Sequence, residues 1–402
     1  MEPILYLCHR IPFPPNKGDK IRSFNILKYL SAHYEVHLGA FVDDESDWQY
    51  HDELKKYCKS TCLLPMSKKR STLKGLTAFI SGTPITVPYY ADWQMKTWVK
   101  QLITYETDLD KAVIFSSSMA QYVDNEDAAY LTKVIDFVDV DSDKWRQYAE
   151  SKKGLMRFVY HREYKKLAKY EKYICQSFQA SIFVSPQEAK HFRQQLPEAE
   201  HGKVHSILNG VDTSYFNSAA DDIPNIESKT PCICFTGAMD YWANADAVIW
   251  FAHEVWPTLK QKLPELTFYI VGGKPTAEVA KLAEQDGIEV TGRVADVRPY
   301  IQSSFCSVAP MRIARGIQNK VLEAMSMAKP LVMTSMAAEG IDIPTQQSAF
   351  IIDDAEKMVQ AISEIYKKPE LAKQLGQTNR KQIEDNYQWQ AVLAPLTHLI
   401  SE

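Results

Sequence analysis

A chain of 402 residues, of which 45% are hydrophobic and 24% charged, is typical of an ordinary globular protein and is long enough for two domains. Its formal net charge of −4 argues against a general nucleic-acid-binding protein. The seven cysteines are odd in number and lack CxxC spacing, which favours free thiols in a reducing compartment over disulfides or a zinc site.

The first residues of the chain predict a strand, a loop and a helix. The apolar run Ile4 to Cys8 indicates a buried strand, and its short length and the acidic second residue argue against a secretion signal. A proline-rich loop with Gly18 follows, and from Ile21 to Leu30 the apolar residues recur at helical spacing. This order is typical of a Rossmann-like domain, but the loop is equally compatible with an ordinary surface loop.

A basic stretch accompanies the third predicted strand. No acidic residue occurs between Leu54 and Ala91, and apolar residues lie among the basic ones. Such a segment suits the anionic inner face of a membrane, so we predict peripheral attachment through residues 55–74; the alternative is a solvated basic face. No uncharged apolar run reaches the roughly 18 to 20 residues that a membrane span needs. The basic residues are Lys55, Lys56, Lys59, Lys68, Lys69, Arg70 and Lys74.

Acidic residues cluster where the predicted strand from Lys133 ends. In open α/β sheets ligands bind beyond the carboxyl ends of strands, where carboxylates can position an acceptor hydroxyl or take its proton. We therefore predict Asp136 and Asp139 as catalytic residues on the acceptor side. The alternatives are helix capping, for example by Asp141, and binding of a divalent metal. The charged stretch that follows predicts two helices separated at Gly154.

The second half of the chain begins near Lys203. After an acidic, proline-bearing linker, the apolar run from Cys232 predicts a strand that ends at Gly237, where a glycine permits close approach of a ligand to the backbone. The segment that follows, 238–242, has no basic residue. Near the end of this half, Ser348 to Ile352 predict a late strand.

The stretch PMRIARGIQNKVLEAMSMAKP, residues 310–330, predicts a strand end, a loop with a glycine, a helix from about Ile317 and a further strand. A helix N-terminus after such a loop presents free N–H groups and partial positive charge, which suits a diphosphate. Lys320 adds a cation in the first turn, and Glu323 lies one turn further, where a carboxylate can accept hydrogen bonds from a ribose diol. The alternative is a solvated helix start with scattered charges.

The segment ARGIQNKVLEAM resembles the donor-binding motif of glycosyltransferase family 4, whose members are retaining enzymes with the GT-B fold. That family usually has two glutamates eight positions apart; Glu323 matches the second, which holds the ribose, and Arg315 stands in place of the first. This segment and the segment VIDFVDVDSDKW are most similar to the sugar transferases associated with exosortase A (PEP-CTERM) exopolysaccharide systems. The resemblance covers essentially the whole chain.

The resemblance implies an α/β fold of the GT-B type, with two Rossmann-like, doubly wound domains, a cleft between them and a C-terminal helix that crosses back. The expected domains are an acceptor domain, 1–202, a nucleotide-sugar domain, 203–385, and the returning helix, 386–402. Contacts are expected from the N-terminal loop at Gly18, Asp19 and Arg22. Lys320, helped by Arg312, would supply the catalytic positive charge for the diphosphate. The expected donor-binding residues are Gly237, Arg293, Val294, Arg315, Gly316, Ile317, Gln318, Asn319, Lys320 and Glu323.

The function implied is transfer of a sugar, with UDP-sugar as the expected donor, to a lipid-linked or oligosaccharide acceptor in exopolysaccharide biosynthesis. No cofactor, metal or nucleic acid is expected, and the expected location is cytoplasmic, on the inner face of the cell membrane. Two alternatives stay open. A UDP-sugar 2-epimerase-like isomerase shares the GT-B fold, and Arg315 in place of a glutamate leaves room for a catalytically silent, nucleotide-sugar-binding scaffold.

Overall fold

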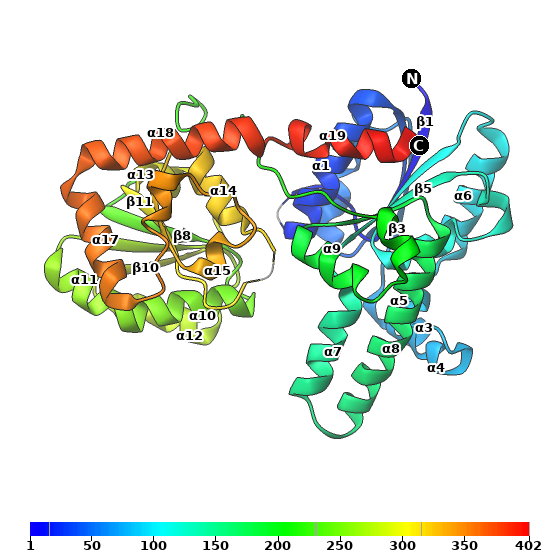
Figure 1. Ribbon diagram of the computed structural model, residues 1–402, viewed down its shortest axis with the longest axis horizontal. Coiled ribbons are helices and arrows are strands. Elements are labelled where there is room, and N and C mark those ends of the chain that lie inside the picture. Colours follow the sequence, from blue (N-terminus) through cyan, green and yellow to red (C-terminus); the bar gives the residue numbers. More distant parts are fainter. Residues whose placement is uncertain (16, 230, 315, 402) are drawn as a thin grey trace. The chain divides into compact units, whose positions relative to one another are not determined.

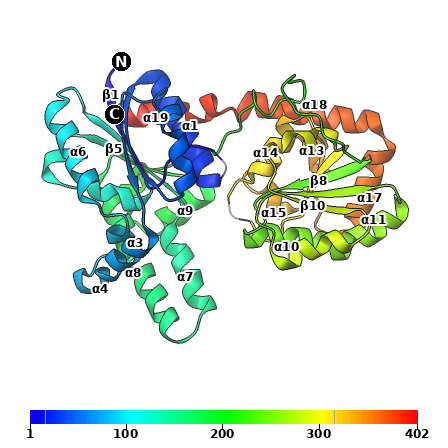
Figure 2. The same ribbon diagram turned by 180° about the vertical axis from the view of Figure 1, so that it is seen from behind.

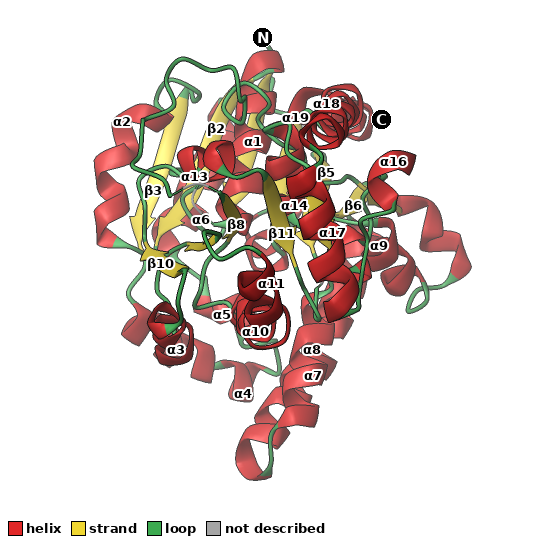
Figure 3. Ribbon diagram, turned by 90° about the vertical axis from the view of Figure 1, so that its left-hand side faces the viewer, coloured by secondary structure: helices red, strands yellow, loops and turns green. Residues whose placement is uncertain are grey.

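The structure is a computed structural model that describes residues 1–15, 17–229, 231–314 and 316–401. Its contacts divide the chain into two compact units. The first comprises Met1–Leu208 and Leu393–Glu402, and the second comprises Asn209–Val392. The boundaries predicted from the sequence, after residues 202 and 385, lie a few residues earlier in the chain. Each unit is an α/β structure in which helices cover the strands (Figures 1 and 3).

Within the described residues, the first unit has a parallel seven-stranded sheet in the order β3-β2-β1-β4-β5-β6-β7. Residues of β1 are completely buried, which explains its continuous apolar sequence, because a parallel sheet is covered on both faces. The strand order reverses between β1 and β4, and this is where ligands bind in doubly wound folds. The strands are β1 (Pro3–Cys8), β2 (Glu35–Val42), β3 (Ser60–Pro65), β4 (Lys111–Phe115), β5 (Thr132–Val138), β6 (Ala180–Phe183) and β7 (Val204–Ser206).

Two long helices of the first unit, α7 and α8, form a hairpin that projects from the sheet (Figures 1 and 2). The break between them falls at Gly154, as predicted, and this glycine has a φ of 64°, a conformation that suits a residue without a side chain. The helices of the unit are α1 (Gly18–His33), α2 (His51–Leu54), α3 (Lys68–Leu76), α4 (Ala78–Ser81), α5 (Thr86–Tyr89), α6 (Trp93–Tyr105), α7 (Asp141–Ser151), α8 (Gly154–Ser177) and α9 (Pro186–Arg193).

The second unit has, in its described residues, a parallel five-stranded sheet in the order β10-β9-β8-β11-β12, so its order reverses between β8 and β11. The strands are β8 (Cys232–Thr236), β9 (Thr267–Val271), β10 (Ile288–Gly292), β11 (Cys306–Ala309) and β12 (Leu331–Met333). The strand predicted from Ser348 to Ile352 is wrong: α16 ends at Ser348, and only one isolated bridge, between Met333 and Ile351, remains.

The helices of the second unit alternate with its strands. They are α10 (Trp242–Trp250), α11 (Trp256–Lys262), α12 (Ala277–Lys281), α13 (Arg298–Ser303), α14 (Asn319–Ser326), α15 (Ser335–Ala338), α16 (Thr345–Ser348), α17 (Ala355–Lys367) and α18 (Pro369–Asn386). The last helix, α19 (Trp389–Ser401), begins in the second unit, and its residues from Leu393 belong to the first. There Thr397 shares a 2.7 Å hydrogen bond with Tyr29 of α1.

Candidate functional site

The carboxyl ends of β8 and β11 form the point of strand-order reversal in the second unit. Glycines leave the backbone exposed to close approach there. A Cβ on Gly272 would lie 1.7 Å from the carbonyl oxygen of Gly237, and Gly272 has a φ of 155°. A Cβ on Gly237 would lie 2.7 Å from Nδ2 of Asn244. Gly272 is therefore required for packing at this edge, independently of any ligand, whereas a side chain at Gly237 would displace only the end of the Asn244 side chain.

Lys320 lies in the first turn of α14 and points to this edge. Its Nζ donates to Oδ1 of Asn244 at 2.9 Å and to Oε1 of Gln318 at 3.3 Å, and it lies 5.1 Å from the centroid of the Phe235 ring. Burial lowers the pKa of Lys320 to about 8, although the nearby carboxylate of Glu323 opposes this shift. An ammonium held by neutral oxygens has no full counter-charge in hydrogen-bond contact, so a phosphate would be a better partner.

Glu323 lies one turn further along α14. Burial raises its pKa to about 7, and the positive charge of Lys320 acts in the opposite direction. Within the described part of the chain, no hydrogen bond reaches its carboxylate. A partly buried carboxylate without a donor is the arrangement that a ribose diol could complete.

The loop before α14 is built around a glycine. Gly316 has a φ of 63°, and its carbonyl accepts a 3.0 Å hydrogen bond from Nε2 of Gln318. The helix begins at Asn319, two residues later than predicted, and Oδ1 of Asn319 accepts from Asn209 at 3.3 Å. Ile317 is buried. Backbone N–H groups of the first helical turn thus lie next to Lys320.

The predicted arginines have different surroundings. Arg312 is half-exposed, and its guanidinium forms a two-point ion pair with Asp246 of α10. Arg315 lies outside the described residues. Arg293 is exposed and lies beside Gly273, since a Cβ on that glycine would be 3.5 Å from the Arg293 Cβ. Val294 packs against the apolar core. The roles of these residues in donor binding stay predictions.

Asn244 is a site residue that sequence reasoning missed. It is buried in the first turn of α10, donates to the carbonyl of Ala238 at 2.9 Å and accepts from Lys320. It therefore connects the loop after β8 with the first turn of α14. The available sequence signal was an amide seven residues after Gly237, at the start of a helix.

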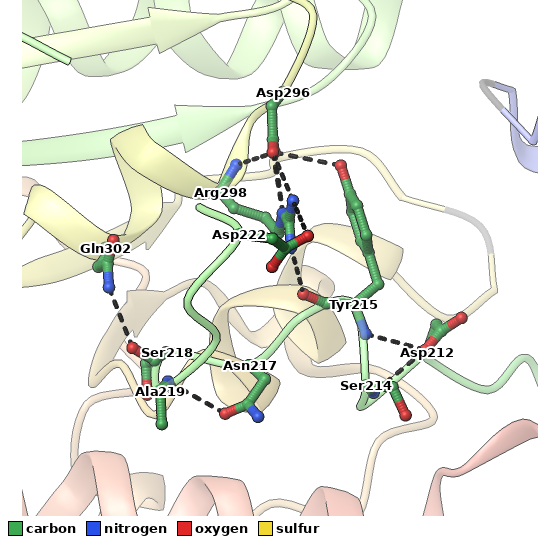
Figure 4. Close-up of polar contacts among 10 residues, drawn as sticks. All are labelled: Asp212, Ser214, Tyr215, Asn217, Ser218, Ala219, Asp222, Asp296, Arg298 and Gln302. Carbon is green, nitrogen blue, oxygen red and sulfur yellow. Dashed lines mark hydrogen bonds and ion pairs between the residues drawn. The ribbon is translucent and has the colours of Figure 1, made fainter. Parts of the chain in front are cut away.

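A second anchor fixes the segment after β10, and Figure 4 shows it. Arg298 at the start of α13 donates to Asp222 at 3.0 and 3.1 Å and to Asp296 at 2.9 Å. It also donates to the carbonyl of Tyr215 at 3.1 Å, and its guanidinium stacks 3.9 Å from that residue's ring centroid. Arg298 thus fastens the segment 212–222 to the loop that carries Arg293.

In the first unit, the predicted residues Asp136 and Arg22 contact each other. Nε of Arg22 donates to Oδ2 of Asp136 at 2.8 Å, and the other carboxylate oxygen accepts from the backbone N–H of Val138 at 2.9 Å. Both side chains are buried. Burial raises the pKa of Asp136 above its ordinary value, and Arg22 opposes that rise. This pair has the features of a structural ion pair, and its predicted role in catalysis stays a prediction.

The other predicted residues of the first unit are accessible. Gly18 is the first residue of α1, whereas the helix was predicted from Ile21. Asp19 is ion-paired with Arg10 at 2.9 Å. Burial opposes ionisation of Asp19, but His9 and Arg10 hold its pKa well below the usual range. Asp139 is partly exposed, and its Oδ2 forms an ion pair with Nζ of Lys144 at 2.9 Å.

His9 is a further residue that sequence reasoning missed. It directly follows β1 at the reversal point, stacks on Phe115 with ring centroids 5.8 Å apart, and its Nδ1 is buried without a hydrogen-bond partner among the described residues. Two non-glycine residues nearby in the sheet, Ser116 after β4 and Val138 in β5, have positive φ angles of 83° and 68°. Strained backbone at neighbouring strand ends is frequent at functional sites.

Several lysines of the basic segment 55–74 form ion pairs with acidic residues, which its sequence alone does not indicate. Lys55 pairs with Asp52 at 2.7 Å, Lys56 pairs with Glu53, and Lys59 pairs with Glu35 at 2.9 Å. Asp52 and Glu53 lie three residues before their partners on the same local segment, whereas folding brings Glu35 from a distant part of the sequence to Lys59. Among the residues that the structure describes, no helix combines the length and the apolar content required to cross a bilayer. In the same residues, no group of three or more potential ligands could hold a metal ion.

Comparisons with known proteins agree with this architecture. Residues 230–368 match the family model described as glycosyl transferases group 1. EpsD of Bacillus subtilis (strain 168), which is assigned as a glycosyltransferase, is 32% identical over 130 residues, 31% of this chain and 34% of EpsD. The match thus spans about a third of that relative.

The likeness to solved structures extends over the whole chain. The crystal structure of TarM from S. aureus has a TM-score of 0.71 at 12% identity, with 100% of this chain and 99% of TarM covered. HepE from Anabaena, solved in complex with UDP and glucose, has a TM-score of 0.68 at 12% identity, with both chains covered completely.

The fold is therefore GT-B, as predicted. The segment matched by the group 1 family includes β8 to β12 and α14, so it contains Lys320 and Glu323. The family match relates residues 230–368 to glycosyl transferases of group 1, and the likeness of the whole chain to solved structures shows its fold.

Proposed function

We propose that this protein is a retaining glycosyltransferase of the hexosyltransferase type that moves a sugar from a nucleoside diphosphate sugar to a saccharide acceptor. The observation that carries the proposal is the arrangement at the reversal point of the second unit. There Lys320 is held by Asn244 and Gln318, and Glu323 lies one helical turn away. The same residues lie inside the segment that matches the glycosyl transferases group 1 family.

Each group has a defined task in this proposal. Lys320 and the N–H groups at the start of α14 would bind the diphosphate and stabilise the charge that develops when it leaves. The Glu323 carboxylate would accept hydrogen bonds from the ribose hydroxyls. Arg312 could add a two-point contact to phosphate after exchanging its partner Asp246. The positive charges of Lys320 and Arg312 would take the place of a metal ion, so we propose that the reaction requires no metal.

We propose UDP-sugar as the donor, because HepE was solved in complex with UDP and glucose and has the same fold. TarM was likewise solved in complex with UDP. On the acceptor side, Asp139 is the more accessible of the two predicted carboxylates, since both oxygens of Asp136 already accept hydrogen bonds. His9, at the reversal point of the first unit, is the second candidate to take a proton from the acceptor.

The proposed biological setting rests on the resemblance of the segments ARGIQNKVLEAM and VIDFVDVDSDKW to exosortase-associated sugar transferases. We propose a lipid-linked acceptor, a role in exopolysaccharide biosynthesis, and a cytoplasmic protein that works at the inner face of the membrane. A membrane-bound acceptor would require the protein to approach an anionic lipid surface.

A thermal-shift screen with UDP, GDP, ADP and dTDP tests the donor site, because a ligand that binds the native state raises its apparent stability. We expect a shift with UDP that is reduced in Glu323→Ala and Lys320→Ala. Loss of Glu323 should weaken binding by about 1.5–3 kcal/mol, as expected for a charged hydrogen-bond pair. The exposed Glu370→Ala on α18 is the matched control. No shift with any nucleotide, or equal shifts in all variants, would contradict the proposal.

Turnover assays separate this function from its alternatives. Transfer of labelled sugar to an acceptor supports the glycosyltransferase. Conversion of the sugar nucleotide without an acceptor would instead indicate an isomerase. Donor binding without turnover across saccharide and lipid-linked acceptors would indicate a binding scaffold.

A further inference from the structure

The tip of the α7–α8 hairpin exposes apolar side chains. All residues from 152 to 158 are exposed. Leu155 is 76% exposed, Phe158 65% and Met156 46%. Large apolar side chains are rarely exposed together without a partner surface. The hairpin projects from the first unit in the views of Figures 1 and 2, so its tip is far from the buried core of its own unit.

Basic side chains lie before and among these apolar ones. Lys152, Lys153 and Arg157 are exposed, and within the described part of the chain none of them has an ion pair. The acidic residues that flank the tip in sequence are already engaged. Glu150 pairs with Arg146 at 2.7 Å, and Glu163 is buried, where it accepts hydrogen bonds from the backbone N–H groups of Ile85 and Thr86 at the start of α5. The tip therefore combines uncompensated positive charge with exposed apolar surface.

A neighbouring short helix extends this surface. Arg162 of α8 donates to the carbonyls of Ala78 and Thr83 at 2.5 and 3.2 Å, and it lies 4.6 Å from the ring centroid of Phe79. These contacts hold α4 against α8. Beside Phe79, Ile80 is 93% exposed. Arg162 follows Phe158 by four residues, which is about one helical turn, or roughly 6 Å, along α8. In Figures 1 and 2, α4 lies beside α8 in the lower part of the first unit, and the tip of the hairpin extends below it.

We propose that the α7–α8 tip, residues 152–158, together with Ile80 of α4, inserts into the interfacial region of an anionic lipid bilayer. Leu155, Phe158 and Ile80 would enter the boundary of the acyl chains. The three basic residues would remain at the level of the anionic headgroups.

The charge pattern selects this partner over the other candidates. A second copy of the same tip would bring like charges together, which opposes self-association. A nucleic acid would satisfy the positive charges but would leave the aliphatic side chains exposed to water. An anionic bilayer satisfies both features.

The inference also changes where the contact is expected. The sequence pointed to residues 55–74, but Lys55, Lys56 and Lys59 are already paired with acidic residues. The inference deepens the proposed function by naming the membrane-facing element. It is tested without nucleotide or acceptor, so its failure would leave glycosyl transfer untouched.

The test is sedimentation of the full chain with vesicles of phosphatidylcholine, with or without phosphatidylglycerol. The first variant, Lys152→Gln with Lys153→Gln and Arg157→Gln, removes the charges of the tip. The second, Leu155→Ser with Phe158→Ser, removes its apolar groups. The charge control is Lys55→Gln with Lys56→Gln and Lys59→Gln, which removes the same number of charges. Tyr105→Ser with Tyr366→Ser replaces exposed aromatic residues elsewhere.

We expect binding to the anionic vesicles only. Each basic residue near an anionic surface contributes about fivefold, so the charge variant should lose roughly 100-fold in partition coefficient. The apolar variant should lose roughly tenfold or more, and both controls should lose less than about threefold. All variants should keep the unfolding midpoint of the wild type, because the substituted residues are exposed.

Three results would overturn the inference. The first is absence of a preference for anionic vesicles. The second is an equal loss in the charge variant and its charge control. The third is a dimer, detected by analytical ultracentrifugation, that dissociates in the apolar variant, which would assign the tip to self-association.

Discussion

Two pairs of opposite charges lie near the carboxyl edges of the two sheets, and they differ in how their charges are satisfied. In the first unit, Arg22 donates a hydrogen bond to one oxygen of the Asp136 carboxylate, and the backbone N–H of Val138 donates to the other. In the second unit, Lys320 donates to neutral oxygens, and no described residue donates to Glu323. The first pair is complete without a ligand, whereas the second is not.

This difference suggests a criterion for ligand sites. A complete buried pair holds its charges through mutual contact, and removal of one partner leaves the other uncompensated. In an incomplete pair, burial disfavours the charged forms, so the pKa of the lysine falls and the pKa of the carboxyl rises. A ligand that supplies the missing hydrogen bonds can offset the free-energy cost of burying these charges. The comparison therefore predicts opposite effects for substitutions in the two pairs.

The largest effect is expected in the complete pair. Arg22→Met should lower the free energy of unfolding by about 3–5 kcal/mol, because Asp136 would remain buried without its counter-charge. Urea unfolding and hydrogen exchange of the β1 and β5 amides measure this loss. Arg22→Met with Asp136→Leu should recover most of the stability. A loss below about 1 kcal/mol would indicate that Asp136 is not held by the pair, which would strengthen its predicted catalytic role.

In the incomplete pair, Glu323→Gln should stabilise the protein in a pH-dependent manner. The pKa of Glu323 is about 7, above its ordinary 4.5, so the folded state binds the proton more tightly than the unfolded state. The free energy of unfolding of the wild type therefore falls below that of the variant as the pH rises from 4.5 to 7. The shift of 7 − 4.5 = 2.5 corresponds to about 3 kcal/mol at pH 8. Urea unfolding at pH 4.5 and 8 measures it, and a difference independent of pH would contradict it.

Nucleotide binding should change the protonation of the same pair. The pKa of Lys320 is about 8, so about half of the side chain is neutral at that pH. A bound diphosphate would raise this pKa, because it favours the charged ammonium. UDP binding at pH 8 should therefore take up as much as about half a proton through Lys320. Calorimetry in two buffers of different ionisation enthalpy measures the uptake, and Lys320→Met should remove most of it. Proton release would count against a diphosphate at this position.

The smallest effect is expected for the exposed pair between Arg312 and Asp246. Exposed ion pairs contribute little, so Arg312→Gln should change the free energy of unfolding by less than about 1 kcal/mol. Its effect on UDP affinity distinguishes a donor-binding arginine from a surface arginine. A weakening of about tenfold is expected if Arg312 contacts phosphate. Unchanged affinity, with Lys320→Met as the positive control, would remove Arg312 from the site.

Much of the fold could be predicted because its signals are local. The apolar runs that became β1, β8 and β11 identified the strands, and the position of Gly154 identified the break between α7 and α8. Limits of elements were less accurate. The helix α14 begins at Asn319 instead of Ile317, because the backbone of Gln318 is extended and its side chain donates to the carbonyl of Gly316.

The candidate site was only partly predictable, because its contacts join distant parts of the chain. Asn244 and Lys320 are 76 positions apart, and Arg22 and Asp136 are 114 positions apart. No local spacing indicates that one carboxylate will be buried with a partner and another left incomplete. The pairing of Lys59 with Glu35 likewise depends on adjacent strands, so the charge of the basic segment could not be judged from sequence alone.

The path of the chain between the two units has a consequence for protein synthesis. The second unit is one continuous segment, Asn209–Val392, whereas the first is completed only by Leu393–Glu402. These last residues bury Leu396 and Ile400 and hold Tyr29 through Thr397. On the ribosome, the first unit is therefore completed only after the second unit has been synthesised, and until then Tyr29 of α1 lacks its partner Thr397. Loss of the final ten residues from a nascent chain should thus affect the N-terminal unit more than the unit to which those residues are adjacent in sequence.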